Sequence, residues 1–249
     1  MSLILALSGM AQVVHAQTAP ECTTDASVDT RLAAALAKPD RPDKLKAKDA
    51  ARDSENRFML QYVKPGDHVL DLGAGGGYSS WVLSAAVCGG SVDSQNPSDW
   101  VSSPGAQTAW AAATAARSNI HVVTSPFTAV PAPAQPYDVI FIGTIYHDTY
   151  NEDGADAVAM DKTLLADLKP GGLVVLIDHN AVAGSGTSAT NTLHRIDKAQ
   201  VLADFAAAGF QLVTDSDALA NKADDHTLKV FDPSIQGYTD RMALVFKKP

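Results

Sequence analysis

The chain has 249 residues, which is enough for one large domain or two small ones. Hydrophobic residues make up 46% and charged residues 19%, a composition typical of a compact globular protein rather than of a disordered chain. No segment approaches the roughly 18 consecutive apolar residues that a transmembrane helix needs, so we expect no stable membrane insertion. The net charge of −9, from 19 basic and 28 acidic residues, argues against a nucleic-acid partner, which usually requires a basic face.

The first 16 residues have the pattern of a signal peptide. The apolar, uncharged run from Leu3 to Val14 is too short to span a membrane, and Val14-His15-Ala16 places small residues where signal peptidase requires them. No Lys or Arg precedes the run, and a buried N-terminal helix is the alternative interpretation. We predict that residues 1–16 are removed on export and that the mature protein is periplasmic.

The two cysteines are Cys22 and Cys88. In an exported protein an even number of cysteines favours a disulfide, and two unrelated thiols are the alternative. On the chain-entropy model, a bridge around a loop of about 66 residues would stabilise the fold by roughly 4 kcal/mol.

Residues 17–57 are predicted to form an N-terminal helical extension, and residues 58–249 the main domain. Helical patterns occur over Thr30–Lys38 and Asp43–Tyr62, separated by a proline-rich turn. From Asp67 onward, short apolar runs alternate with helical patterns. The predicted strands are His68–Leu72, Gly90–Ser94, His121–Thr124, Asp138–Gly143 and Leu173–Asp178, and the helices between them are Tyr78–Cys88, Ala106–Arg117 and Ala155–Leu168.

This alternation predicts an α/β fold in which helices cover both faces of a parallel sheet. The end of the chain breaks the pattern. A helix over Asp197–Ala208 is followed by two strands, Phe210–Val213 and Met242–Phe246, with no helix between them. The sequence therefore predicts a terminal antiparallel hairpin on an otherwise parallel sheet.

A glycine-rich segment, Asp71-Leu72-Gly73-Ala74-Gly75-Gly76-Gly77-Tyr78, follows the first strand of the sheet and opens a helix. Glycines let a backbone approach a ligand closely, and a helix N-terminus favours negative groups. Tyr78 stands where a dinucleotide fingerprint has its last glycine, and the lysine of a phosphate loop is absent. An acid two residues before the first glycine instead resembles motif I of class I S-adenosylmethionine (SAM)-dependent methyltransferases; a bare glycine turn is the alternative.

Other segments carry the same resemblance. Residues 137–142 resemble the family's fourth strand, and residues 168–177 its turn into the fifth. The resemblance implies a Rossmann-like doubly wound sheet with strand order 3-2-1-4-5-7-6. A narrower group of exported predicted methyltransferases is similar in its short motifs, which here are Gly75–Tyr78, Gln95–Pro97, Tyr146–Asp148, Asp178-His179, Leu193–Asp197 and Phe231–Pro233.

The resemblance also implies a set of cofactor-binding residues. Asp71 would contact the amino group of SAM, directly or through water, and Gly73, Gly75, Gly77 and Tyr78 would form the binding loop. Asn96 stands where the family usually has an acid that accepts both ribose hydroxyls, so a charge-assisted contact is replaced by a neutral one. The usual adenine-contacting acid is also missing, and Phe127 at that place either stacks on adenine or belongs to the core.

Polar residues follow the fourth and fifth strands, which the expected sheet order makes neighbours. Ligands of open α/β sheets bind outside the carboxyl ends of the strands. Residues 146–148 should therefore lie near residues 178–180, and a small, flexible stretch at residues 184–187 could bring residues 194–197 over the same mouth. For each histidine in this set, a hydrogen-bonded packing role is the alternative.

We predict methyl transfer from SAM to a small-molecule acceptor. His147 is the predicted general base, because histidine titrates near neutral pH, with Asp148 orienting it and His179 and His194 as alternates. The rival hypothesis is a non-catalytic protein that binds a metal or a metabolite on a methyltransferase fold. The sequence leaves the acceptor and the oligomeric state open.

A divalent metal is a further expectation. Asp148 and Asp178-His179-Asn180 resemble the metal-binding positions of catechol O-methyltransferase-like enzymes, except that a histidine interrupts the Asp-Asn pair. Oxygen ligands alone would suit Mg²⁺, whereas adding His147, His179 or His194 would favour Zn²⁺, Fe²⁺ or Mn²⁺. The alternative is that these residues only cap the strand and line a pocket.

Overall fold

The structure is a computed structural model that describes residues 26–249. The predicted signal peptide, residues 1–16, lies outside the described residues, and so does Cys22. Cys88 has no free thiol, but its pairing with Cys22 stays a prediction for the same reason.

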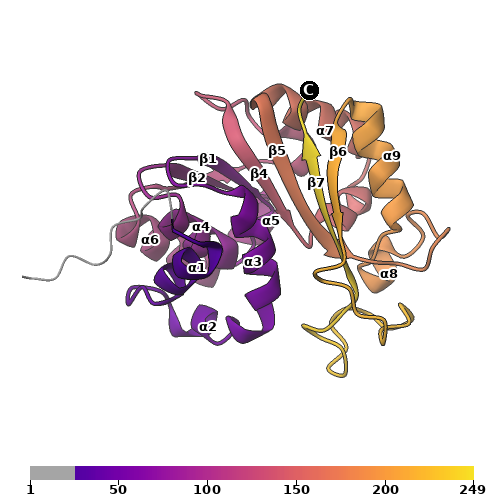
Figure 1. The fold of residues 1–249 in the computed structure, drawn as a ribbon, viewed down its shortest axis with the longest axis horizontal. Helices are drawn as coiled ribbons and strands as arrows, with labels where there is room; N and C mark the ends of the chain where they lie inside the picture. Colours follow the sequence, from indigo (N-terminus) through magenta and orange to yellow (C-terminus); the bar gives the residue numbers. More distant parts are fainter. Residues whose placement is uncertain (1–25) are drawn as a thin grey trace, which may run out of the picture.

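Seven strands form one sheet in the order β3-β2-β1-β4-β5-β7-β6 (Figure 1). Strands β1 to β5 are parallel, and β7 runs antiparallel to both β5 and β6. The predicted fold class, strand order and terminal hairpin are confirmed. The strands are β1 His68–Leu72, β2 Ser91–Asn96, β3 Ile120–Thr124, β4 Tyr137–Gly143, β5 Leu168–His179, β6 Gln211–Ser216 and β7 Arg241–Lys247.

Helices connect and cover the strands. The α-helices are α1 Val28–Leu36, α2 Asp43–Lys46, α3 Asp53–Tyr62, α4 Tyr78–Ala86, α5 Ser98–Val101, α6 Pro104–Ala116, α7 Ala157–Asp167, α8 Thr190–Leu193 and α9 Lys198–Ala208. Short 3₁₀ helices occur at η1 Ala50–Arg52, η2 Phe127–Ala129 and η3 Tyr146–Asn151. In the described part of the chain, no helix is long and apolar enough to cross a membrane.

The prediction of one continuous helix over Asp43–Tyr62 is wrong, because α2, η1 and α3 divide this segment. Asp49, which lies at this interruption, makes hydrogen bonds to residues that are outside the segment. Asp49 accepts hydrogen bonds from both terminal nitrogens of Arg41, at 2.6 and 2.9 Å, and from the Tyr78 hydroxyl at 3.0 Å. These partners lie outside the segment, so its local helical pattern carries no information about them.

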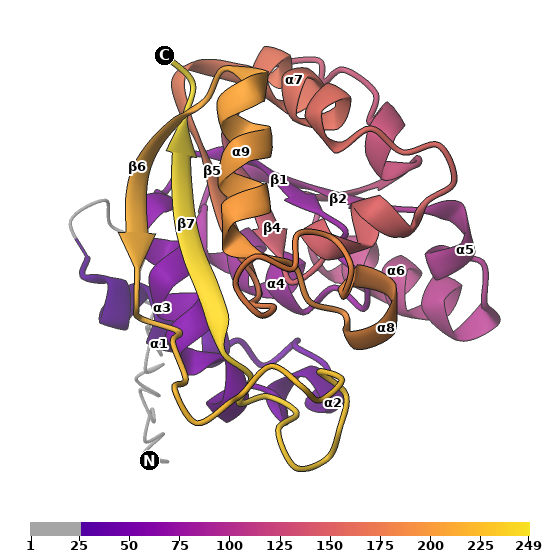
Figure 2. The ribbon, with the colours of Figure 1, turned by 90° about the vertical axis from the view of Figure 1, so that its right-hand side faces the viewer.

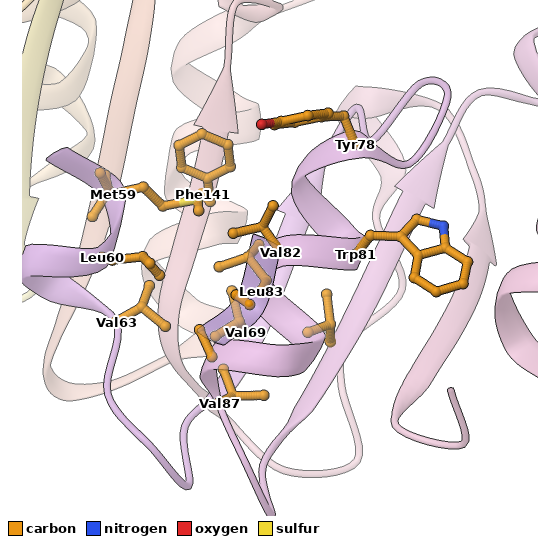
Figure 3. Close-up of a cluster of buried hydrophobic side chains, with 14 of the residues drawn as sticks. Met59, Leu60, Val63, Val69, Tyr78, Trp81, Val82, Leu83, Val87 and Phe141 are labelled. Atoms are coloured by element: carbon orange, nitrogen blue, oxygen red, sulfur yellow. The ribbon is translucent and has the colours of Figure 1, made fainter. Parts of the chain in front are cut away.

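The sheet has an apolar core on each face, because successive side chains of a strand point to opposite sides. Figure 3 shows one face, where Val69 and Phe141 pack with Met59 and Leu60 of α3 and with residues of α4. On the other face, Leu70 and Ile140 belong to a separate cluster with residues of α7 and α9. Figure 2 shows α9 lying over the β5–β7 side of the sheet. Because the apolar cores cover the two faces of the sheet, the carboxyl ends of the parallel strands are the place where a ligand can bind.

Candidate active site

The loop between β1 and α4 has a left-handed backbone at Gly73, Gly75 and Gly77, where φ is +66°, +55° and +80°. A side chain at Gly73 would lie 2.7 Å from Cγ1 of Ile145, and one at Gly77 would lie 3.1 Å from the Trp110 ring. A Cβ on Gly75 would meet only the Gly73 carbonyl, at 3.9 Å. Packing therefore requires glycine at Gly73 and Gly77, whereas Gly75 leaves open space for a ligand.

The end of β2 holds this loop in place. The Gly73 N–H donates to Oε1 of Gln95 at 3.0 Å, and the Gly75 N–H donates to Oδ1 of Asn96 at 2.7 Å. Asn96 is fully buried, and its Nδ2 has no hydrogen-bond partner among the described residues. A buried N–H donor without a partner is costly, so a hydroxyl oxygen of a bound ligand would suit this position.

A cavity of about 370 Å³ opens at the carboxyl ends of β2 and β3. Two acids line it, Asp99 and Glu152, and burial raises the pKa of Glu152. Sequence reasoning missed both. Asp99 lies three residues beyond Asn96 and was detectable, whereas the connection after η3 brings Glu152 from a distant part of the chain. Phe127 is 2% exposed and packs edge-on against Trp100, which confirms its interpretation as a core residue.

Asp71 lies beneath the loop with its carboxyl group enclosed. It accepts a 2.6 Å hydrogen bond from the Ser80 hydroxyl, which in turn bonds the Ser94 hydroxyl at 2.8 Å. Burial raises the pKa of Asp71 to about 7. These contacts tie β1 to α4 and β2, and the contact with the amino group of SAM stays a prediction.

Tyr78, the first residue of α4, is held by the N-terminal helices. Its hydroxyl accepts a hydrogen bond from Asn56 Nδ2 at 2.8 Å and donates to Asp49, and the Arg52 guanidinium lies 4.2 Å from the ring centroid. Burial raises its pKa to about 12. The extension is thus fastened to the first turn of the helix that the glycine loop opens.

A second group of residues lies after β4 and β5; we call His147, Asp148, Asp178 and His194 the His147 centre. Asp178 is fully buried and accepts hydrogen bonds from the backbone N–H of His147 and from its Nδ1, each at 2.8 Å. This pairing fixes the ring and directs Nε2 toward Asp148 and His194. Nε2 lies 3.4 Å from Asp148 Oδ1 and 3.3 Å from His194 Nδ1.

Charge and burial act in opposite directions on these groups. Burial lowers the pKa of His147, but the negative charge and hydrogen bond of Asp178 outweigh burial and hold that pKa above its ordinary value. Burial raises the pKa of Asp178, and the neighbouring His147 brings it below its ordinary value. Burial lowers the pKa of the more peripheral His194. The two groups therefore stabilise each other's charged forms, and a proton that reaches His147 is held beside the Asp178 carboxylate.

His179 lies beside this centre, with its ring centroid 6.1 Å from that of His147, but its nitrogens do not converge with those of His147, Asp148 and His194. Its Nδ1 contacts the Thr239 hydroxyl at 2.7 Å, and burial lowers its pKa to about 3. Arg195 is fully buried and pairs with Asp224 at 2.9 Å. Asp197 accepts the Gly184 N–H at 2.6 Å, so the stretch expected over the mouth is bonded to the start of α9.

Phe231 is a neighbour of the centre that sequence reasoning named only within a motif. It comes from the long connection between β6 and β7, is 56% exposed, and its ring centroid lies 5.0 Å from that of His194. A backbone bond from Val230 to the Leu193 carbonyl at 3.2 Å holds the connection beside α8. The connection extends beyond the end of the sheet, near α8, in Figures 1 and 2.

The fold is shared with many solved structures. A SAM-dependent methyltransferase from Aquifex aeolicus is 18% identical with a TM-score of 0.58, over 84% of this chain and 99% of that one. The [4+2]-cyclase SpnF is 16% identical with a TM-score of 0.60, over 80% of this chain and 81% of that one. The O-methyltransferase NcsB1 from neocarzinostatin biosynthesis, solved with S-adenosyl-L-homocysteine and 1,4-dihydroxy-2-naphthoic acid, is 16% identical with a TM-score of 0.51, over 81% of this chain and 55% of that one. At these identities the likeness establishes the fold alone.

A search of curated proteins finds no match. The family model of protein-L-isoaspartate(D-aspartate) O-methyltransferase (PCMT) matches residues 54–200, which is more than half of the chain. The matched region holds the glycine loop, Asn96 and the whole His147 centre. The protein therefore belongs to the PCMT family, within the class I SAM-dependent methyltransferase superfamily.

Proposed function

We propose that this protein transfers a methyl group from SAM to a small molecule that carries an ionisable hydroxyl or amine. The observation that carries the proposal is the Asp178–His147 pair at the carboxyl ends of β4 and β5, beside the glycine loop.

The residues around the loop fit the cofactor. Gly75 leaves open space, and the buried Asn96 Nδ2 lacks a partner within residues 26–249. The adjoining cavity presents the carboxyl groups of Asp99 and Glu152. Asn96 would donate to a ribose hydroxyl, while its Oδ1 keeps its bond to the loop. Asp99 and Glu152 could accept from the amino group of adenine in place of the missing family acid. When bound, SAM supplies an electrophilic methyl group, and these residues hold it in position.

The His147 centre adjoins the loop because β1 and β4 are neighbours in the sheet. Ile145, two residues before His147, packs against Gly73. As the new bond to the methyl carbon forms and the bond to sulfur breaks, a hydroxyl or amine acceptor must lose its proton. A carboxylate is already deprotonated at neutral pH and needs no such help. A proton-accepting centre here therefore favours a hydroxyl or an amine.

Phe231 supports an aromatic acceptor. Its exposed ring beside His194 offers an apolar surface at the rim of the centre, and Lys229 lies 5.7 Å from the ring centroid. A flat ring with a negative substituent would suit this pair. NcsB1, solved with 1,4-dihydroxy-2-naphthoic acid, is a fold neighbour with such a ligand.

The family name favours a second candidate, the methylation of an isoaspartyl carboxyl group in a protein. Because a carboxylate needs no proton acceptor, this candidate predicts that methyl transfer does not depend on His147. A non-catalytic role is the third possibility, and SpnF, a cyclase with this fold, illustrates that the fold does not fix the reaction.

Transfer of a labelled methyl group from SAM separates these candidates. The acceptors would be an isoaspartyl peptide and aromatic hydroxyl and amine compounds, including 1,4-dihydroxy-2-naphthoic acid. We expect labelled aromatic product, and a loss of at least about 100-fold in kcat for His147→Gln with unchanged affinity for SAM. His121→Ala, which removes a histidine distant from the centre, should retain full activity. Label on the peptide alone, undiminished in His147→Gln, would establish the second candidate instead.

A further inference from the structure

We propose that the His147 centre is a zinc site, with Nε2 of His147, Oδ1 of Asp148 and Nδ1 of His194 as the three protein ligands. These three atoms lie within reach of one ion. This inference goes beyond the proposed function, because zinc binding can be present or absent whether or not the protein transfers methyl groups.

The spacing of the three atoms matches tetrahedral coordination. They are 3.3 Å (His147–His194), 3.4 Å (His147–Asp148) and 3.5 Å (His194–Asp148) apart. With zinc–ligand bonds of 2.0–2.1 Å, ligand atoms on a regular tetrahedron are about 3.3–3.4 Å apart, whereas adjacent ligands of an octahedron are only about 2.8–3.0 Å apart. The triangle thus forms one face of a tetrahedron with its fourth position open, as in catalytic zinc sites.

When His147 is neutral, the hydrogen bonds around the three ligand atoms leave the lone pair of its Nε2 directed toward the centre of their triangle. Because the buried Asp178 carboxylate bonds Nδ1 of His147, this nitrogen carries a proton, and Nε2 is an acceptor whenever the ring is neutral. The carboxylate oxygen of Asp148, also an acceptor, lies 3.4 Å away. Two facing acceptors repel each other unless a proton on Nε2 or a metal ion lies between them, and the proposed site places a metal ion there.

The residues behind the ligands have the arrangement that zinc sites use. A ligating histidine usually donates its other N–H to a carboxylate, and a ligating carboxylate is itself hydrogen-bonded. Asp178 fills the first role, and Asn151 Nδ2 the second, by donating to Asp148 Oδ1 at 3.1 Å. His194 adopts a left-handed backbone with φ +56°, which is uncommon for a residue other than glycine and is held by its surroundings.

The exposure of the ligands indicates where a substrate would reach the ion. The His147 side chain is 3% exposed, whereas those of Asp148 and His194 are 21% and 24% exposed. His147 is thus the most deeply placed of the three ligands, and the ion would be reached from the side of Asp148 and His194. If the proposed function holds, an acceptor hydroxyl bound at the fourth position would have its pKa lowered by the cation, and His147 would serve as a ligand instead of a base.

Another histidine–aspartate group in the molecule provides the control. His68 of β1 and His121 of β3 contact different oxygens of Asp93 of β2, at 3.3 and 3.0 Å, and none of the three belongs to the His147 centre. The Tyr137 hydroxyl also donates to Asp93, at 2.9 Å, so hydrogen bonds hold this group together. A variant of His121 therefore removes a histidine–aspartate contact without touching the proposed site.

The test is titration of the metal-free protein with Zn²⁺ by calorimetry and with Co²⁺ by visible absorption. We expect one equivalent of each, with the intense absorption of tetrahedral Co²⁺. His194→Asn, which tolerates the left-handed backbone, and Asp148→Asn should lose stoichiometric binding. Asp178→Asn should weaken binding by about 10- to 100-fold, as changes behind a ligand do. His121→Ala should bind as the wild type does, and thermal unfolding would confirm that each variant is folded.

Absence of stoichiometric binding by the wild type would overturn the proposal, and so would equal binding by folded His194→Asn. A parallel titration with SAM keeps the two claims apart. Zinc binding without SAM binding would refute only the proposed function, and SAM binding without zinc binding would refute only the zinc site.

Discussion

Asp71 shows how burial changes the behaviour of a single residue. It is the acid of the glycine motif, yet its carboxyl group is enclosed between β1 and α4 and bonded to Ser80. Desolvation disfavours its charged form, which is why its pKa is raised to about 7. The folded protein therefore holds a proton here at pH values where the unfolded chain has released it.

This difference predicts a pH-dependent stability. Between about pH 4 and pH 7 the folded state binds more protons than the unfolded state at Asp71, so the free energy of unfolding falls as the pH rises, by an amount on the order of 4 kcal/mol. Asp71→Asn removes the titration and can still accept the Ser80 bond. In urea unfolding at pH 4, 5.5 and 7, the wild type should lose stability relative to this variant. Two parallel stability curves would show that Asp71 is charged in the folded protein.

At this scale the sequence predicts proximity better than orientation. The sheet order placed His147 near Asp178 and His179, and the structure brings His147, Asp148 and His194 together. Which of two adjacent strand residues faces the centre depends on the pleat and its register, so Asp178 is at the centre and His179 is not. Asn96 was expected to bind the ribose hydroxyls as both acceptor and donor; its oxygen is engaged with Gly75, which leaves the donor Nδ2 without a partner among the described residues.

The glycine loop and the end of β2 act as one element. Gln95 and Asn96 take the loop N–H groups as partners, so the loop is shaped before any ligand arrives. Such a preformed site lowers the ordering cost of binding. Gly75 and Gly76 are positions in this loop where an added side chain would enter open space, and Gly75 is the one whose N–H is held by Asn96.

We therefore expect Gly75→Ala to weaken SAM binding by at least about 10-fold, because its methyl group occupies space that the cofactor needs. The left-handed backbone at Gly75 adds strain of roughly 1–2 kcal/mol. Gly66→Ala is the matched control, since Gly66 also has a positive φ and open surroundings but lies before β1. Calorimetry should give wild-type affinity for Gly66→Ala, with similar losses in melting temperature for both variants. Equal affinities in all three proteins would remove Gly75 from the site.

Hydrophobic periodicity predicted the strands and the long helices, such as β4 and α9, because the spacing of apolar residues within each segment is enough to indicate its structure. It failed over Asp43–Tyr62, where Arg41 and Tyr78 draw Asp49 into contacts from outside the segment. Hydrophobic periodicity also could not predict the structure of the connection between β6 and β7. Its fixed points are buried polar pairs such as Arg195–Asp224, and these leave no periodic signal.

At the scale of the whole molecule, the seven-stranded sheet assembles residues that are far apart in the chain. The glycine loop follows β1, Asn96 ends β2, and the His147 centre joins the ends of β4 and β5 with α8. All lie where parallel strands end, which is the binding edge of open α/β sheets. A resemblance that covers the sheet could therefore predict the site's location, while its acceptor depends on side chains from the irregular connections.

We also propose that the protein is exported, that its mature chain begins near Gln17, and that Cys22 and Cys88 form a disulfide. The apolar run and small residues before Gln17 support export, and the lack of a free thiol at Cys88 supports the bridge. Intact-mass measurement of protein from the periplasm should show the shortened chain with two hydrogens fewer than its reduced form. Two free thiols would refute the bridge, and an uncleaved chain in the cytoplasm would refute export.

The central claim, that the site binds SAM for methyl transfer, is tested most directly by calorimetric titration of the purified wild-type protein with SAM. We predict saturable binding of one equivalent, competed by S-adenosylhomocysteine. The space at Gly75 lies where the cofactor would sit, and so does Nδ2 of Asn96, which has no partner in the part of the chain that the structure describes. A folded protein that shows no saturable binding of either compound would contradict the account.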